Sequence, residues 1–227
     1  SVTYREAVAL GIDNLEHGLF ANTDYVPNKE PDRCPSGFRR DYYDLDIEGP
    51  EVQATFREMI DNNVPMSSTL AVYEMSVPGR PPIDQRALDV LAPEVAEDVL
   101  AENQRYTERD PDDYGTSPAV FKKAMEYELA FFRAGGILGA GVDPTGYGAA
   151  LPGFGDQRNY ELLIEAGFTP GEAIQVMSAN GAKILEMEDS IGSIEVGKIA
   201  DLAVIEADLA ADPANIKKVV TVFKNGV

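Results

Sequence analysis

Three segments of the chain show the same succession of apolar and polar residues, and in each the pattern predicts a helix followed by a strand. Apolar residues at helical spacing come first, as with Met125, Leu129 and Phe132, and a Gly or Asn that can cap the helix follows them. A short apolar run and a polar residue complete each segment. This repetition predicts an α/β fold with a parallel sheet. The segments are residues 5–18, 52–72 and 124–146.

The polar residues that end the three apolar runs are His17, the pair Ser68-Thr69 and Asp143. They fall at the carboxyl ends of the predicted strands, where open α/β sheets and (β/α)8 barrels gather their chemistry. A long loop follows each strand, and long loops at this edge of a sheet usually form a pocket. The loops span residues 18–50, 73–117 and 144–158, the second with a predicted helix at about 84–105.

The carboxyl-terminal part of the chain changes character. Two further helices are predicted at residues 159–167 and 169–187, and the second begins with a capping box of Thr169 and Glu172. Segments rich in β-branched residues, partly alternating with polar ones, come after these helices and predict the strands of a separate small β unit. These strands are expected within residues 192–209 and 216–227.

Composition narrows the partners that the chain can bind. With 19 basic and 39 acidic residues, the formal net charge of −20 repels phosphate backbones and argues against nucleic acid. The chain has no run of 18 apolar residues, so no segment is expected to span a membrane. Cys34 is the single cysteine and cannot form an internal disulfide, which favours a cytoplasmic location.

His17 and Asp143 are the candidate chemical groups. His17 is the only histidine, and either it is a hydrogen-bonding group in the fold or it is a metal ligand or acid–base group. Gly18 beside it permits a close approach of backbone or ligand. Asp143 follows a buried apolar run, where an unpaired carboxylate is costly, so it needs a cation, a hydrogen-bond donor or a catalytic task. A helix cap or an ion pair would also satisfy it.

One histidine and one aspartate do not complete a zinc site, which takes three or four protein ligands. The chain offers no second histidine, and its cysteine lies in a predicted loop. Either other acidic residues complete the site, or the remaining ligands lie outside these 227 residues.

Four segments in order resemble the carboxyl-terminal half of the metal-dependent amidohydrolase superfamily, in the branch with imidazolonepropionase and Xaa-Pro dipeptidase-like members. They read GIDNLEHG, GILGAGVDPTG, AGFTPGEAIQVMSANGAKIL and GSIEVGKIADLAVIEAD. The resemblance implies strands 6–8 and the last helices of a (β/α)8 barrel in residues 1–188. Residues 189–227 would then be the carboxyl-terminal strands of a small β-sandwich. Strands 1–5, with their metal ligands, would be missing.

The same resemblance implies the chemistry. His17 would be the metal ligand of strand 6, and Asp143 would be the ligand and catalytic base of strand 8. A divalent metal, with zinc favoured over manganese or iron, would supply a metal-bound hydroxide that attacks an amide or ring C–N carbon. The substrate would be a small amide or a dipeptide.

Substrate recognition would fall to the loops. Arg33, Arg39, Arg40 and Tyr73 are candidates for binding a substrate carboxylate, since arginine offers two parallel donors, unless these arginines are simply solvated. Three tyrosines would either line the pocket or pack the loops, and they are Tyr42, Tyr43 and Tyr147.

Two segments depart from the family pattern. Residues 155–159 stand where relatives carry a polar motif that often contains histidine, and residues 177–180 stand where A-T-x-N is usual. The first departure leaves the substrate type open.

Two other interpretations stay open. An incomplete barrel exposes sheet edges, so the chain could be a non-catalytic fragment that needs the missing amino-terminal half or a homo-oligomer. It could also be a metal-free α/β binding module with Asp143 as a polar anchor.

Overall fold

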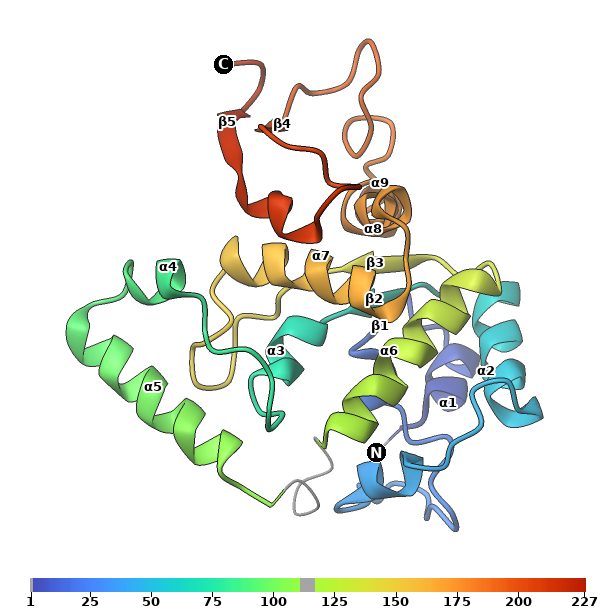
Figure 1. The fold of residues 1–227 in the computed structure, drawn as a ribbon. Coiled ribbons are helices and arrows are strands. Elements are labelled where there is room, and N and C mark those ends of the chain that lie inside the picture. Colours follow the sequence, from blue (N-terminus) through green and yellow to red (C-terminus); the bar gives the residue numbers. More distant parts are fainter. Residues whose placement is uncertain (1, 111–116) are drawn as a thin grey trace.

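A computed structural model describes residues 2–110 and 117–227, and its centre is a parallel three-stranded sheet in the order β1-β2-β3 (Figure 1). Residues 111–116 of the second predicted loop lie outside the described residues. Leu15 pairs with Met66, and Met66 pairs with Leu138, so the three strands run in register. The strands are β1 (Leu15–Glu16), β2 (Met66–Ser68) and β3 (Leu138–Ala140).

A helix precedes each strand and lies beside the sheet (Figure 1). The helix stops fall where the sequence predicts them, because Asn63 and Gly135 follow the second and third helices with positive φ angles of 56° and 100°. The mixed α/β class and the parallel sheet are therefore confirmed. The third strand is shorter than the predicted run of residues 137–142. The helices are α1 (Tyr4–Ala9), α2 (Pro50–Asp61) and α6 (Pro118–Arg133).

The core lies between these helices and the sheet. Phe56 of α2 packs edge-on against Tyr127 and Phe131 of α6, with ring centroids 4.8 Å and 5.4 Å apart, and all three are fully buried. Gly136, which links α6 to β3, is required by this packing. A Cβ atom there would lie 2.3 Å from the Phe131 ring, so only glycine lets the chain pass so close.

Three predicted helix boundaries are wrong, each for a local reason. The single helix expected at 84–105 is two helices, and Pro93 begins the second of them because it lacks a backbone donor. The helix expected from residue 159 begins five residues earlier, at Phe154. The helix expected at 169–187 breaks at Ser178, whose φ and ψ of −129° and −78° are not helical. The capping box at its start is confirmed.

Those corrected helices complete the α-helical part of the described chain, together with one short helix after β2. They are α3 (Leu70–Glu74), α4 (Gln85–Leu88), α5 (Pro93–Thr107), α7 (Phe154–Ala166), α8 (Pro170–Met177) and α9 (Ala179–Ile184). Within residues 2–110 and 117–227, no helix has the length and apolar character that crossing a bilayer requires.

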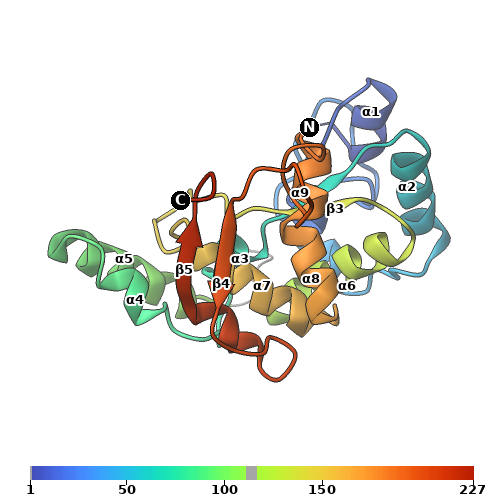
Figure 2. The same cartoon turned by 90° about the horizontal axis from the view of Figure 1, so that it is seen from above.

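A second, antiparallel sheet of two strands lies over α7 (Figure 2). The strands are β4 (Leu202–Ile205) and β5 (Val219–Phe223), joined through the 3-10 helix η4 (Pro213–Lys217) that packs on α7. Both strands lie within the segments where strands are expected, residues 192–209 and 216–227, and residues 192–201 precede β4 without forming a strand. All five residues of β5 are exposed. A domain boundary at residues 188 and 189 stays a prediction.

Substituting Phe56→Ala is expected to lower the free energy of unfolding by about 3–5 kcal/mol, since it removes a buried ring from between two aromatic neighbours. Denaturant unfolding followed by circular dichroism measures this change. The control is Val90→Ala, because Val90 is 64% exposed and should lose well under about 1 kcal/mol. Equal losses in the two variants would contradict the assigned core.

Candidate functional site

The carboxyl ends of the three parallel strands bring His17, Thr69 and Asp143 together. His17 Nδ1 lies 2.8 Å from the Thr69 hydroxyl oxygen, at hydrogen-bonding distance. On the other side of the ring, His17 Nε2 lies 3.8 Å from Asp143 Oδ2. The side chains of His17 and Asp143 are 29% and 31% exposed, so both can be reached from solvent. The two residues that the sequence singles out are therefore neighbours, and Thr69 is the contact between them and β2.

The backbone at both residues is in the left-handed region. The φ angle is 71° at His17 and 45° at Asp143. Such angles cost on the order of 1–3 kcal/mol each in residues other than glycine, and they persist only where surrounding contacts hold them. At His17 two contacts hold the backbone. The His17 N–H donates to the Ser67 carbonyl, and the Tyr4 hydroxyl donates to the Gly18 carbonyl. Tyr4 shares its proton between the carbonyls on both sides of His17, those of Glu16 and Gly18.

A buried carboxyl group lies beneath this turn. Glu128 of α6 is almost fully buried, and a Cβ atom on Gly18 would lie only 3.1 Å from Glu128 Oε1. Burial raises the pKa of Glu128 to about 8, although a weaker hydrogen bond with Ser68 lowers it. Glu128 Oε2 has no hydrogen-bond partner among the described residues. The group is therefore mainly protonated at neutral pH and places no full charge under the strand ends.

Glu128 is a residue that the sequence analysis missed. The signal was present, because Glu128 falls on the same helical face as the buried residues Ala124, Met125 and Phe131. An acid within an apolar stripe of a helix is a buried acid, which needs an explanation. Thr69 was recognised as a strand end, but its contact with His17 was not foreseen.

Tyr73 lies beside His17, and Arg39 lies next to Tyr73. The Tyr73 ring meets the His17 ring edge-on, with centroids 5.7 Å apart, and stacks on Phe20 at 4.1 Å. Arg39 lies over both aromatic rings, with its Cζ atom 5.3 Å from the Phe20 centroid and 5.2 Å from the Tyr73 centroid. Arg39 Nε also donates to the Phe20 carbonyl at 3.1 Å. The half-buried guanidinium is thus fixed next to the strand ends.

The other loop candidates lie elsewhere. Arg40 is exposed and does not belong to the described lining of the pocket beside Asp143. Arg33 is exposed and pairs with Glu30 at 2.7 Å. Tyr42 is fully buried and donates to the Asn22 carbonyl, so it packs the loop.

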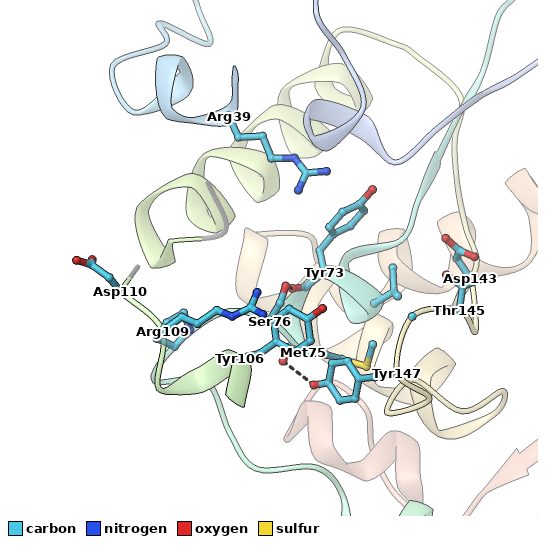
Figure 3. A pocket seen from close by; sticks show the side chains of 13 residues that line it. Arg39, Tyr73, Met75, Ser76, Tyr106, Arg109, Asp110, Asp143, Thr145 and Tyr147 are labelled. Atoms are coloured by element: carbon cyan, nitrogen blue, oxygen red, sulfur yellow. Dashed lines mark hydrogen bonds between the residues drawn. The ribbon is translucent and has the colours of Figure 1, made fainter. Parts of the chain in front are cut away.

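A pocket of about 270 Å³ opens beside Asp143 (Figure 3). Arg39 and Tyr73 line it on one side, and Tyr106 of α5 and Tyr147 line it on another (Figure 3). The pocket therefore joins the strand ends, the loop after β1, α5 and the loop after β3. The further lining includes the apolar residues Val72, Met75 and Pro78 and the charged residues Arg109 and Asp110.

The donor atoms of His17 and Asp143 fit part of a metal site. Because Nδ1 of His17 is engaged by Thr69, Nε2 is the nitrogen left for a cation, and it faces the Asp143 carboxylate. Two ligands are fewer than the three or four that zinc takes. Among residues 2–110 and 117–227, no group of three His, Cys, Asp or Glu side chains is placed to hold a metal. Further ligands would have to come from outside the described residues.

Comparison with known proteins shows that part of the chain is similar to amidohydrolases. The amidohydrolase family matches residues 137–227. The imidazolonepropionase of Fusobacterium nucleatum is 35% identical over 83 residues, which are 33% of this chain and 20% of that protein. The family match covers the carboxyl-terminal part of the chain, which is less than half of its 227 residues.

Solved amidohydrolase structures share the fold. A Xaa-Pro dipeptidase with bound methionine aligns with a TM-score of 0.58 at 20% identity, over 98% of this chain and 41% of that one. Another amidohydrolase aligns with a TM-score of 0.59 at 19% identity, over 100% of this chain and 42% of that one. This chain therefore spans less than half the length of these relatives. The family match includes Asp143 but not His17, whereas the second structural alignment includes both.

The buried acid predicts an unusual pH dependence. In the unfolded chain Glu128 has a pKa near 4.5, against about 8 in the fold. Between these pH values the folded chain therefore keeps the Glu128 proton, whereas the unfolded chain has released it. Its stabilising contribution is complete below about pH 4.5 and is lost as the pH rises towards 8, by at most about 1.4 kcal/mol per pH unit. Denaturant unfolding between pH 5 and pH 8 should show this loss relative to Glu128→Gln, which cannot titrate.

The matched control is Glu126→Gln on the same helix, because Glu126 is partly exposed and pairs with Lys122 and Lys123. Its free energy of unfolding should follow that of the wild type across the pH range. Parallel curves for the wild type and Glu128→Gln would show that the carboxyl is not held neutral.

Proposed function

We propose that this chain carries the carboxyl-terminal part of a metal-dependent amidohydrolase that cleaves a C–N bond in a small amide or a dipeptide. The observation that carries the proposal is the His17–Asp143 pair at the carboxyl ends of β1 and β3, 3.8 Å apart and open to a pocket. The match of residues 137–227 to the amidohydrolase family supports it, as does the similarity to an imidazolonepropionase. In this proposal β1, β2 and β3 are the last three strands of a (β/α)8 barrel, and residues 189–227 belong to a β-sandwich.

The chemistry follows from the two side chains. A divalent cation held there would supply activation of a water and polarisation of the substrate carbonyl. His17 holds the cation through Nε2, since Thr69 engages Nδ1. Asp143 would also hold the cation, and as the base it would take a proton from the attacking water and pass it to the leaving nitrogen. Zinc fits this mixture of imidazole and carboxylate, and manganese and iron also accept it.

Substrate binding falls to Arg39 and Tyr73 in this proposal. Both line the pocket next to Asp143, and the guanidinium of Arg39 is held by the Phe20 carbonyl and by aromatic rings. Arg40 is left out, because it is exposed and absent from the described lining of that pocket. A cytoplasmic location is proposed only from the single cysteine.

A second candidate is a chain that binds but does not turn over without a complementary polypeptide or a second copy. The observation in its favour is the two-residue ligand set within the described residues. The exposed apolar residues of the β4–β5 sheet also favour it, since such a face is usually covered. These residues are Val204, Val219, Val220, Val222 and Phe223.

Because His17 is the only histidine of the chain, its NMR signals can report on metal binding. In an untagged sample, the imidazole NMR signals report on His17 alone. Added Zn²⁺ should shift these signals, and Asp143→Asn should weaken zinc binding by about tenfold or more, because it removes a charged ligand. Asp189→Asn, which changes an exposed acid outside the site, should bind zinc as the wild type does. His17 signals that do not shift with zinc, or zinc binding by Asp143→Asn equal to that of the wild type, would contradict the proposed metal site.

The same samples separate the two candidates. Zinc-loaded protein that releases free amine from acylated amino acids or dipeptides, with the turnover abolished in Asp143→Asn, supports the hydrolase. Zinc binding without turnover supports the chain that needs a partner. The assay follows the free amine by fluorescence labelling.

A further inference from the structure

The hydroxyl of Thr69 does not cap the helix that it precedes. Thr69 is the N-cap residue of α3, yet among the described residues its side chain accepts no hydrogen bond from the first turn of that helix. Three other helices have the ordinary arrangement, in which a Ser or Thr N-cap with an extended backbone accepts from a first-turn N–H. These caps are Thr3, Ser117 and Thr169, with ψ angles of 167°, 157° and 157°, against 38° at Thr69.

The Thr69 hydroxyl is directed to His17 instead. Its oxygen lies 2.8 Å from His17 Nδ1, and Thr69 is only 3% exposed, so little water reaches this contact. One side-chain angle sets where the hydroxyl points, so a hydroxyl placed on the imidazole is not available to the helix. The first turn of α3 therefore needs another acceptor.

Asn159 of α7 supplies that acceptor. The N–H of Ala71, the second residue of α3, donates to Asn159 Oδ1 at 3.1 Å in a buried contact. An N-cap side chain commonly receives the N–H of this position. The Asn159 amide nitrogen lies 3.5 Å from Ser68 Oγ, and Asn159 is 1% exposed. Because a buried N–H without an acceptor is costly, Asn159 takes over the task of the cap.

The preceding residue of α7 holds the other end of α3. Arg158 donates through Nε and Nη2 to the two carboxylate oxygens of Glu74, the last residue of α3, each at 2.7 Å. A helix of five residues is not stable by itself, and α3 packs against α7 (Figure 1). Two consecutive residues of α7, Arg158 and Asn159, thus fix both ends of the helix that follows Thr69.

We infer that Asn159 is a positioning residue for His17. By accepting the Ala71 N–H, Asn159 releases the Thr69 hydroxyl from capping, and this hydroxyl holds the imidazole at Nδ1 with Nε2 turned to Asp143. The effect of Asn159 passes through Thr69. This inference rests on the proposed function only for the task of Nε2 as a metal ligand, since the orientation of the ring needs no metal.

Nitrogen NMR of the untagged 227-residue chain, treated with chelator and kept at one alkaline pH, tests this inference, because His17 gives the only imidazole signals. Thr69→Val removes the hydroxyl and keeps the shape of the side chain, so it marks the Nδ1 signal of a ring without this contact. Asn159→Leu leaves the Ala71 N–H without its acceptor and draws the Thr69 hydroxyl back to the helix. The Nδ1 signal of Asn159→Leu should therefore move from the wild-type position towards that of Thr69→Val.

A double variant separates positioning from general damage. With Thr69→Val already present, Asn159→Leu should leave the His17 signals where Thr69→Val alone puts them, because the path through Thr69 is gone. Asn159→Asp keeps an acceptor oxygen and should retain the wild-type Nδ1 signal. The matched control is Thr169→Ala, which removes an ordinary cap bond from α8 and should lower stability without moving the His17 signals.

Hydrogen exchange tests the same step without a change at Asn159. If Asn159 is the acceptor, the Ala71 amide of Thr69→Val should exchange within about twofold of its wild-type rate, measured relative to Val72. Val72 is the reference because its N–H donates to the Thr69 carbonyl, which the substitution keeps. Faster exchange than this would show that the Thr69 hydroxyl caps α3 and would overturn the inference.

Two NMR results would also overturn it. They are a wild-type Nδ1 signal in Asn159→Leu that circular dichroism shows to be folded, and a further His17 shift in the double variant. If Asn159→Leu does not fold, the exchange of Ala71 in Thr69→Val decides. Failure of the proposed function is distinguishable, because it shows in the zinc titration. A ring that depends on Asn159 but does not bind zinc would overturn the metal site and leave the role of Asn159 in place.

Discussion

The parallel pairing of β1, β2 and β3 is the constraint on which the rest of the structure depends. Because the strands run in one direction and in register, the residues after them emerge at one edge of the sheet. His17 and Asp143 are 126 positions apart in the chain, yet their side chains lie 3.8 Å apart. A register slip in β2 would also move Thr69 away from His17 Nδ1, and the imidazole would lose the contact that orients it.

Near this edge, local features that cost folding free energy accompany the placement of the two side chains. Both His17 and Asp143 have positive φ, and the carboxyl of Glu128 is buried with one oxygen unpartnered. Tyr4 offsets part of this cost through its bonds to the carbonyls that flank His17. Strain that is concentrated at two strand ends next to a pocket is the pattern expected of a site that is kept for chemistry.

Periodicity and strand-end position predicted the sheet, the helix stops and the pairing of His17 with Asp143 at one edge. They could not predict where helices break, because Pro93 and Ser178 interrupt runs whose apolar spacing continues. Nor could they separate Arg39 from Arg40, since neighbouring residues in a loop differ only in the direction that the 3-10 helix η2 (Phe38–Tyr42) gives their side chains. The contact of Tyr106 with Tyr147 joins α5 to the loop after β3, and such long-range packing leaves no local pattern.

The most direct test of the account is to locate a metal in crystals of this chain. Crystals soaked with zinc and measured on both sides of the zinc absorption edge give an anomalous difference map. The account predicts a peak between His17 Nε2 and the Asp143 carboxylate, and none there in crystals of Asp143→Asn. A zinc peak only at other carboxylates of this acidic chain, with none beside His17, would contradict the central claim.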